Sequence, residues 1–256
     1  MLFFTNYHTG QPFSDFVTLY GKHKLVHVIP DSNIIDFDQY YRQLAKQIGI
    51  PIIYEEDPVT GEIKANKWTE IKYDKSKAAD TYKHSATSQP LHTDYGYFNF
   101  EIETSFFYCT EQAEFGGATT FIDVDLLVDL LIKNETDLFQ KLQQTKIHFG
   151  RKENPITNYE GFILSNDELG WKINWNYYRA IINDENREVI NNFKLFLDTQ
   201  IEKSGELKEI KLNPGEAVFF KDRRLLHGRN SFIGDRQLNK GAIASSIPES
   251  IIKLLQ

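Results

Sequence analysis

The sequence predicts a mainly β fold, a β-sandwich or jelly roll with helices packed outside it. Aromatic residues make up 14% of the 256 residues, and aromatic side chains favour strands. Several segments alternate between apolar and polar residues, as half-buried strands do. Two longer segments repeat apolar residues at helical spacing, so we expect helices inserted between the strands and lying outside the sheets.

The first elements along the chain are a short strand, a helix and a turn. Residues 24–30 form an apolar run typical of a strand. Over residues 36–48 the aromatic and aliphatic side chains fall on one helical face, and a glycine follows. Residues 57–61 have the composition of a turn between two strands. Residues 74–88 are polar and predict a long loop, a kind of segment that is often functional in compact domains.

The second half of the chain adds strands and two helices. Residues 99–109 alternate between apolar and polar side chains, and so do residues 171–177, which predicts two half-buried strands. Helices are predicted over residues 124–145, with a break near Asn134, and over residues 184–203. No repeat or linker divides the sequence, so we expect one domain over residues 1–256.

Composition restricts the classes of function. The net charge of −7 argues against a nucleic-acid partner, because a phosphate backbone requires a basic surface. The lone Cys109 forms no internal disulfide and no cysteine-based zinc site, which favours a reducing, cytoplasmic setting. The most apolar run, residues 124–132, contains two aspartates, and the N-terminus lacks a secretory pattern, so we expect no membrane segment. A homo-oligomer is left open.

The sharpest local feature is the pair His92 and Asp94. On an extended segment, residues two apart point to the same face, so both side chains can bind one ion. The pair alone is equally typical of a polar surface. A second histidine, His227, follows a turn and an apolar run over residues 214–220 that predicts a buried strand; alone, it would be assigned to packing at the strand end. Two histidines and a carboxylate leave open positions on a metal and suit non-haem Fe(II), which then takes a chelating cosubstrate and O₂.

Two further features could bind an organic acid. Gly116 and Gly117 permit a tight turn and close backbone approach, and the hydroxyl of Thr119 follows them. Arg236, nine residues after His227, could bind a carboxylate through two hydrogen bonds. Taken singly, these features indicate only a strand entry and a solvated arginine.

Together, in this order, the motifs resemble the Fe(II)/2-oxoglutarate oxygenases of the taurine dioxygenase and clavaminate synthase-like superfamily, over about residues 85–245. The resemblance implies a double-stranded β-helix (jelly-roll, cupin-like) core with flanking helices. It implies that His92, Asp94 and His227 bind the iron. It also implies that Arg236 holds the distal carboxylate of 2-oxoglutarate, with Thr119 assisting. The spacing from His227 to Arg236 is shorter than usual in that family, so Arg229 stays open as a substitute.

The implied activity is hydroxylation of an unactivated C–H bond in a small polar metabolite, such as an amino acid or a derivative, with release of succinate and CO₂. Halogenating members have a small residue in place of Asp94, so hydroxylation is favoured here, with desaturation and cyclisation left open. Arg179, Asn174 and Tyr95 are the candidate substrate residues. Residues 74–88 are expected to act as a lid. The substrate and the regiochemistry do not follow from the sequence.

Three other interpretations stay open. A cupin-type metal enzyme would use the same three ligands without 2-oxoglutarate, so Arg236 would have no role in it. A hydroxylase of peptides or nucleic acids is a second interpretation, and the acidic charge argues against nucleic acid. A non-catalytic jelly-roll binding module is the third, although such a module has no need of the four motifs together.

Overall fold

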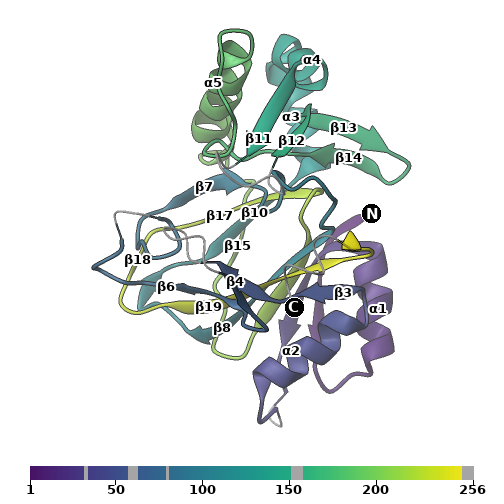
Figure 1. Cartoon of the computed structure of the whole chain (residues 1–256), viewed down its shortest axis with the longest axis vertical. Helices are drawn as coiled ribbons and strands as arrows, with labels where there is room; N and C mark the ends of the chain where they lie inside the picture. Colours follow the sequence, from purple (N-terminus) through teal and green to yellow (C-terminus); the bar gives the residue numbers. More distant parts are fainter. Residues whose placement is uncertain (32–33, 57–62, 79–80, 151–157, 250–256) are drawn as a thin grey trace.

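The computed structural model describes the chain except for residues 32–33, 57–62, 79–80, 151–157 and 250–256. Two β-sheets pack face to face at its centre, and helices cover the outer face of each sheet (Figure 1). The predicted fold class, a mainly β jelly-roll core with flanking helices, is confirmed.

The larger sheet has seven strands among the described residues, and its only parallel pair lies at one edge. In order, its strands are β1 (Leu2–His8), β2 (His23–Ile29), β16 (Ala217–Lys221), β8 (Thr104–Glu111), β19 (Gln237–Ala244) and β3 (Ile50–Ile52), with β6 (Thr69–Lys72) also pairing with β19. The strands predicted around residues 24–30 and after Pro214 are confirmed as β2 and β16.

The smaller sheet carries two of the predicted metal ligands. Its four strands among the described residues are β15 (Lys208–Ile210), β10 (Thr119–Asp123), β17 (Leu225–Arg229) and β7 (Gln89–His92). Neighbouring side chains point to opposite faces: Phe121 and Leu225 pack between the sheets, whereas Ile122 and Leu226 pack against helices. Two short pairs lie outside the sheets, β4 (Tyr54–Glu56) with β5 (Ile63–Ala65) and β9 (Phe115–Gly116) with β18 (Phe232–Ile233). The turn predicted over residues 57–61 lies outside the described residues.

Helices α1 (Phe13–Lys22) and α2 (Phe37–Lys46) cover the outer face of the larger sheet. Asp36 caps α2 by accepting a hydrogen bond from the backbone of Gln39, so the predicted helix is confirmed. The prediction of a half-buried strand over residues 99–109 was wrong. Strand β8 begins only at Thr104, and it is buried on both faces because these helices cover the side opposite the second sheet.

A helical layer covers the outer face of the smaller sheet (Figure 1). It contains α3 (Val124–Asn134), α4 (Thr136–Gln144), α5 (Arg187–Phe196) with a π-helical turn over Leu197–Ile201, and the hairpins β11 (Lys146–Gly150)–β12 (Asn158–Phe162) and β13 (Leu164–Asp167)–β14 (Gly170–Ile173). The break near Asn134 is confirmed. Helix α5 begins three residues later than predicted, because Asn183 and Asn186 bond to each other's backbone in a turn.

The predicted strand over residues 171–177 ends early, at Ile173. Beyond it the chain turns to bond with the segment that carries Asp94. The backbone N–H of Thr93 donates to the carbonyl of Trp175 at 2.6 Å, and the Thr93 hydroxyl accepts from the Trp175 N–H at 3.2 Å. This exchange brings residues 175–179 toward the metal-ligand candidates.

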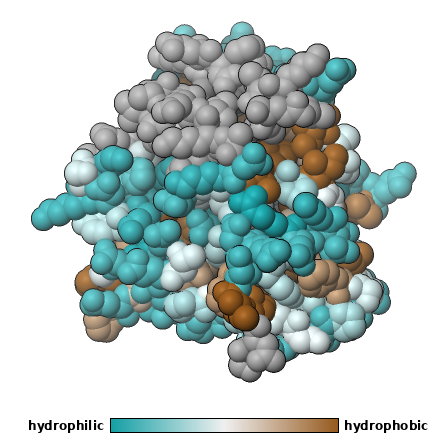
Figure 2. All heavy atoms as spheres, turned by 60° about the horizontal axis from the view of Figure 1, so that its bottom comes forward, coloured by the Kyte–Doolittle hydropathy of each residue, from teal (hydrophilic) through white to brown (hydrophobic). Residues whose placement is uncertain are grey.

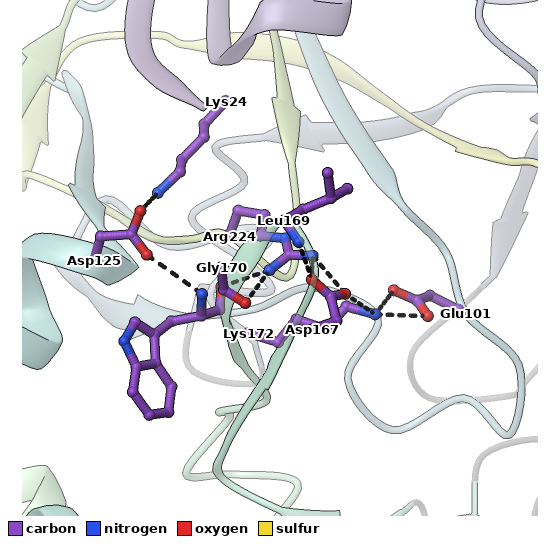
Figure 3. A network of polar contacts seen from close by, with 9 residues as sticks. Lys24, Glu101, Asp125, Asp167, Leu169, Gly170, Lys172 and Arg224 are labelled. Carbon is purple, nitrogen blue, oxygen red and sulfur yellow. Dashed lines mark hydrogen bonds and ion pairs between the residues drawn. The ribbon is translucent and has the colours of Figure 1, made fainter.

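A network of ion pairs joins the helical layer to the sandwich (Figure 3). Lys24 in β2 is 1% exposed and pairs with Asp123 and Asp125, where α3 begins. Arg224, in the loop before β17, donates to two carbonyls of β14 and to the carboxylate of Asp167. The buried cations Lys24 and Arg224 therefore tie segments distant in sequence to one another.

On the face shown in Figure 2, the described residues form a mostly hydrophilic surface with separate apolar patches. Where the chain is described, the longest α-helix, α3, has 11 residues, whereas a membrane-spanning helix needs about 20 apolar residues. No helix of the described residues is long and apolar enough to cross a membrane.

We expect Lys24→Met to destabilise the fold by about 2 kcal/mol. Removal of a buried partner typically costs about 3–5 kcal/mol, and the figure is lower here because Asp125 is 44% exposed and can be hydrated. Urea unfolding measures the effect, with Lys22→Met on the exposed end of α1 as the control. Equal midpoints for the two variants would contradict this role of Lys24.

Candidate metal and cosubstrate site

The three predicted metal ligands lie together. Strand pairing sets His92, the last residue of β7, opposite His227 in β17, and their ring centroids are 4.3 Å apart. Asp94 follows two residues after His92 and is buried, as both histidines are. One ligand atom from each side chain lies within 4.8 Å of the other two.

The protonation of the ligand atoms follows from their hydrogen bonds. His92 Nδ1 lies 2.8 Å from the carbonyl of Pro90. A carbonyl can only accept, so Nδ1 carries a proton, and in the neutral ring Nε2 is the nitrogen with the lone pair for a metal. Nε2 of His92 lies 3.6 Å from Asp94 Oδ1, and Nε2 of His227 lies 3.4 Å from Asp94 Oδ2. The nitrogens therefore face the carboxylate that would share a metal with them.

The donor set fits a divalent metal. Asp94 Oδ2 is buried without a hydrogen-bond partner among the described residues, which is costly for a carboxylate oxygen unless a cation binds it. Two imidazoles and one carboxylate leave open coordination positions and suit Fe(II). These three residues would hold the metal.

Electrostatics keep Asp94 charged. Burial acts to raise the pKa of Asp94, but Lys240 and His227 outweigh burial and hold this pKa well below its usual value. Burial lowers the pKa of His227, and the neighbouring His92 lowers it further. At neutral pH the carboxylate is ionised and His227 is neutral, the states that metal binding requires.

Lys240, in β19 of the opposite sheet, was missed by the sequence analysis. Its ammonium lies 2.5 Å from Asp94 Oδ1 and 4.6 Å from the centre of the Tyr95 ring. The ion pair occupies Oδ1 and leaves Oδ2 facing His227. Leu238 and Lys240 in β19, and Arg236 just before it, all line the same cavity, and this spacing of two is the signal that could have identified Lys240.

Asp222 positions the segment that bears Asp94. Its carboxylate is fully buried and accepts hydrogen bonds from the backbone N–H groups of Asp94 at 3.0 Å and Tyr95 at 3.2 Å. The hydroxyl of Ser105 donates to it at 3.3 Å. Asp222 lies between β16 and β17, so one side chain links the strand of His227 to the Asp94 turn. The sequence analysis assigned no role to Asp222.

The two candidate cosubstrate arginines differ in their partners. Arg229 donates to the backbone carbonyls of Tyr82, Ser85 and Thr87 at 2.7–3.2 Å. Arg236 uses only Nε, which donates to the carbonyl of Gly117 at 3.1 Å, and it forms no ion pair among the described residues. Burial lowers the pKa of Arg236 to about 10, so it stays charged at neutral pH. Arg229 fastens a loop, and Arg236 is the arginine left to bind an acid.

The metal-ligand candidates open into a cavity of about 670 Å³. Its inner wall contains the three ligands, Thr119, Arg236 and Lys240. Its outer wall comes from residues 81–87, residues 175–179 and the end of α5. Metal, cosubstrate and substrate could all bind in this one space.

The three predicted substrate residues lie in different places in the structure, and only one of them lines the cavity that contains the metal-ligand candidates. Arg179 lines the cavity, with its guanidinium 5.3 Å from the centre of the Tyr97 ring. Asn174 lines a different, neighbouring cavity of about 190 Å³. Tyr95 is buried and lies beneath Lys240 rather than in the cavity wall.

The segment predicted as a lid, residues 74–88, forms no helix or strand before β7 where it is described. Arg229 binds three of its carbonyls, and the hydroxyls of Tyr82 and Tyr178 lie 2.9 Å apart. Burial, with the bond to Tyr178, raises the pKa of Tyr82 to about 12, so the Tyr82 hydroxyl is protonated at neutral pH. The segment thus covers one side of the cavity.

The sequence over residues 22–242 matches the model of the taurine catabolism dioxygenase TauD, TfdA family. The mitochondrial trimethyllysine dioxygenase of Gallus gallus is 29% identical over 163 residues, which is 57% of this chain and 38% of that protein. The γ-butyrobetaine dioxygenase of Homo sapiens is 27% identical over 164 residues, covering 59% of this chain and 41% of that protein. The matched region thus spans about two fifths of the length of these relatives.

A solved structure shares the fold. An asparagine oxygenase in complex with Fe(II), 2S,3S-3-hydroxyasparagine and succinate superposes with a TM-score of 0.67 at 12% identity. The match covers 91% of this chain and 78% of that one. The likeness supports the jelly-roll assignment.

We expect Asp222→Asn to weaken metal binding roughly tenfold to a hundredfold, the usual effect of removing a group that orients a metal ligand. The side-chain amide of asparagine has one acceptor oxygen, whereas the carboxylate has two. It would therefore accept the hydrogen bonds of the two backbone N–H groups less well. Anaerobic calorimetry with Mn(II) measures the affinity, and circular dichroism reports the fold. Ser105→Ala, which removes only a donor to Asp222, serves as the control. A folded Asp222→Asn protein with unchanged Mn(II) affinity would refute this role.

Proposed function

Because the chain belongs to the taurine catabolism dioxygenase TauD, TfdA family, we propose that it is an Fe(II)- and 2-oxoglutarate-dependent oxygenase. Its reaction is hydroxylation of an unactivated C–H bond in a small polar metabolite, such as an amino acid or a derivative. Succinate and CO₂ leave as coproducts. His92, Asp94 and His227 hold the metal, and Arg236 binds the cosubstrate.

One observation carries the proposal: a buried arginine without an acidic partner shares a cavity with the three ligands. Arg236 is 5% exposed and lines the same space as His92, Asp94 and His227. A buried guanidinium needs an anionic partner to offset its desolvation, and the distal carboxylate of 2-oxoglutarate supplies one. A cupin-type enzyme without this cosubstrate would leave Arg236 unexplained.

In the proposed reaction, the residues around the metal site position the ligands and the cosubstrate. Fe(II) and 2-oxoglutarate, when bound, would supply the oxidising chemistry that consumes O₂. Asp222 fixes the backbone of Asp94, and Lys240 fixes Oδ1, so that Oδ2 faces His227. Thr119 lines the same cavity as Arg236, and its hydroxyl is proposed to assist in binding the acid.

The outer wall orients the substrate and excludes water. Arg229 holds residues 82–87 over the cavity, and Tyr82 meets Tyr178 across it. Water exclusion strengthens every charged contact inside and protects reactive species from side reactions. Arg179 faces the substrate from this wall. Asp94 keeps its carboxylate where halogenating enzymes have a small residue, which favours hydroxylation.

The proposal gives the protein a small-molecule substrate, handled by a single domain over the whole chain. The cytoplasmic location and the absence of a nucleic-acid partner stay predictions of the sequence. Arg236 is proposed as the main cosubstrate anchor, and Arg229 is proposed as a loop anchor.

We expect Arg236→Gln to raise the 2-oxoglutarate concentration needed for half-maximal turnover roughly tenfold to a hundredfold. The basis is that a hydrogen bond to a charged group contributes about 1.5–3 kcal/mol. The Fe(II) requirement should change little, because Arg236 is no metal ligand. Succinate formation across a 2-oxoglutarate series, using any amino acid that supports turnover, measures this effect.

Arg229→Gln is the matched control. It should mainly increase protease cleavage within residues 74–88, because it releases three backbone carbonyls. If Arg229→Gln raised the 2-oxoglutarate requirement and Arg236→Gln did not, the assignment of Arg236 as the residue that binds the cosubstrate would be wrong. If neither variant raised it, the cupin-type interpretation would gain support.

A further inference from the structure

Gln89, the first residue of β7, lines the cavity that contains the metal-ligand candidates. Its side-chain nitrogen lies 3.1 Å from Nε2 of His92. Because Nδ1 of His92 carries a proton toward the carbonyl of Pro90, Nε2 of the neutral ring is the acceptor and the amide of Gln89 is the donor. The amide thus uses the same lone pair that a metal would take.

A β-bulge turns Gln89 toward His92. In the pairing of β7 with β17, His92 lies opposite His227, and Gln89 lies opposite Arg229. Three positions along β7 therefore span the same length as two positions along β17, so β7 contains one extra residue. On a regular strand, residues three apart point to opposite faces, whereas Gln89 and His92 line one cavity. Bulges often redirect side chains in this way beside active sites.

Gly228 allows the bulged strand to approach β17 closely. This glycine lies between the two residues of β17 that pair with β7. A Cβ at this position would lie 2.7 Å from the backbone carbonyl oxygen of Gln89, closer than van der Waals contact allows. Any other residue would push the backbone of Gln89 away. Both strands therefore contain a feature that places Gln89 beside His92.

A metal bound to Nε2 of His92 would take the acceptor of the Gln89 amide. A zinc–imidazole bond, for example, is about 2.0–2.1 Å long, so a metal fits closer to Nε2 than the amide nitrogen lies. The side chain of Gln89 forms no second hydrogen bond among the described residues. Its N–H groups then need another acceptor. Oxygen atoms bound to the metal would be the acceptors next to His92, and the proposed cosubstrate supplies such oxygens.

We propose that the side-chain amide of Gln89 donates a hydrogen bond to a metal-bound oxygen of 2-oxoglutarate. This inference rests on the proposed function and deepens it, because it adds a contact at the end of the cosubstrate opposite to the carboxylate that Arg236 binds. Metal alone competes with Gln89 for one lone pair. Metal and cosubstrate together give the amide a new acceptor, so Gln89 couples the binding of the two.

Replacement of Gln89 by methionine tests the inference, because methionine has a similar length and no N–H. Calorimetry without O₂ measures Mn(II) binding first, and then 2-oxoglutarate binding to the Mn(II)-loaded protein. In Gln89→Met, Mn(II) should bind about threefold more tightly, because no hydrogen bond to His92 is given up. 2-Oxoglutarate should bind about tenfold less tightly, because a donor to a charged group is lost. Gln43→Met, at an exposed position of α2, is the matched control and should change neither affinity.

Gln89→Glu tests the same contact with the opposite polarity. Its carboxylate would attract Mn(II) and repel the cosubstrate, so metal affinity should rise and 2-oxoglutarate affinity should fall by more than in Gln89→Met. The visible spectrum gives a separate readout. In Gln89→Met, the charge-transfer band of the complex with Fe(II) and 2-oxoglutarate should move to shorter wavelength, because a hydrogen bond to the keto acid lowers the energy of its acceptor orbital.

The signs of the two affinity changes separate the proposed contact from a structural role. An unchanged affinity for 2-oxoglutarate in both Gln89 variants would overturn the inference. Weaker binding of Mn(II) and 2-oxoglutarate together would also overturn it, because a distorted site weakens both. Circular dichroism reports the fold, and Gln89→Glu decides the question if Gln89→Met does not fold. Failure of both variants to fold would assign Gln89 a structural role instead.

The unmodified protein separates this inference from the proposed function. If it binds neither Mn(II) nor 2-oxoglutarate, the proposed function fails. If it binds both and the Gln89 variants bind 2-oxoglutarate equally well, only the inference about Gln89 fails.

Discussion

The pairing of β7 with β17 is the constraint on which the site depends. It places His92 opposite His227 inside the sandwich, where neither ring can be fully hydrated. The strands alone do not place the third ligand, because Asp94 lies in a turn after β7. Asp222 supplies this placement through two backbone hydrogen bonds. The buried carboxylate of Asp222, which is not a proposed metal ligand, thus positions the carboxylate of Asp94, which is one.

The charges of the cavity follow from its place between the two sheets. Lys240 and Arg236 reach the site from β19 and from the residue before it, in the larger sheet, whereas the histidines belong to the smaller sheet. Each buried charge then needs a partner in the cavity. Lys240 forms an ion pair with Asp94, whereas Arg236 has no acidic side-chain partner among the described residues. Arg236 is therefore a buried positive group that the fold leaves for the acid that the reaction consumes.

Sequence patterns predicted the fold class and the convergence of the ligand candidates, but not the side chains that support them. Periodicity identified α3, α4 and most of α5, because their buried faces are regular. It failed at β8, whose two faces are both covered, since alternation reports burial on one side only. Local motifs identified His92 and His227. Lys240 and Arg229 instead contact residues that lie 140 or more positions away in the sequence, and no local pattern predicts such contacts.

The most direct measurement of the central claim is the visible absorption spectrum of the metal-free protein, recorded without O₂ as Fe(II) and then 2-oxoglutarate are added. The account predicts a weak charge-transfer band that appears only when both are present, and that is lost in His92→Ala. A spectrum without the band, in a protein that has bound Fe(II), would contradict chelation of the cosubstrate at the three-residue site. Failure to bind Fe(II) at all would contradict the assignment of His92, Asp94 and His227 as metal ligands.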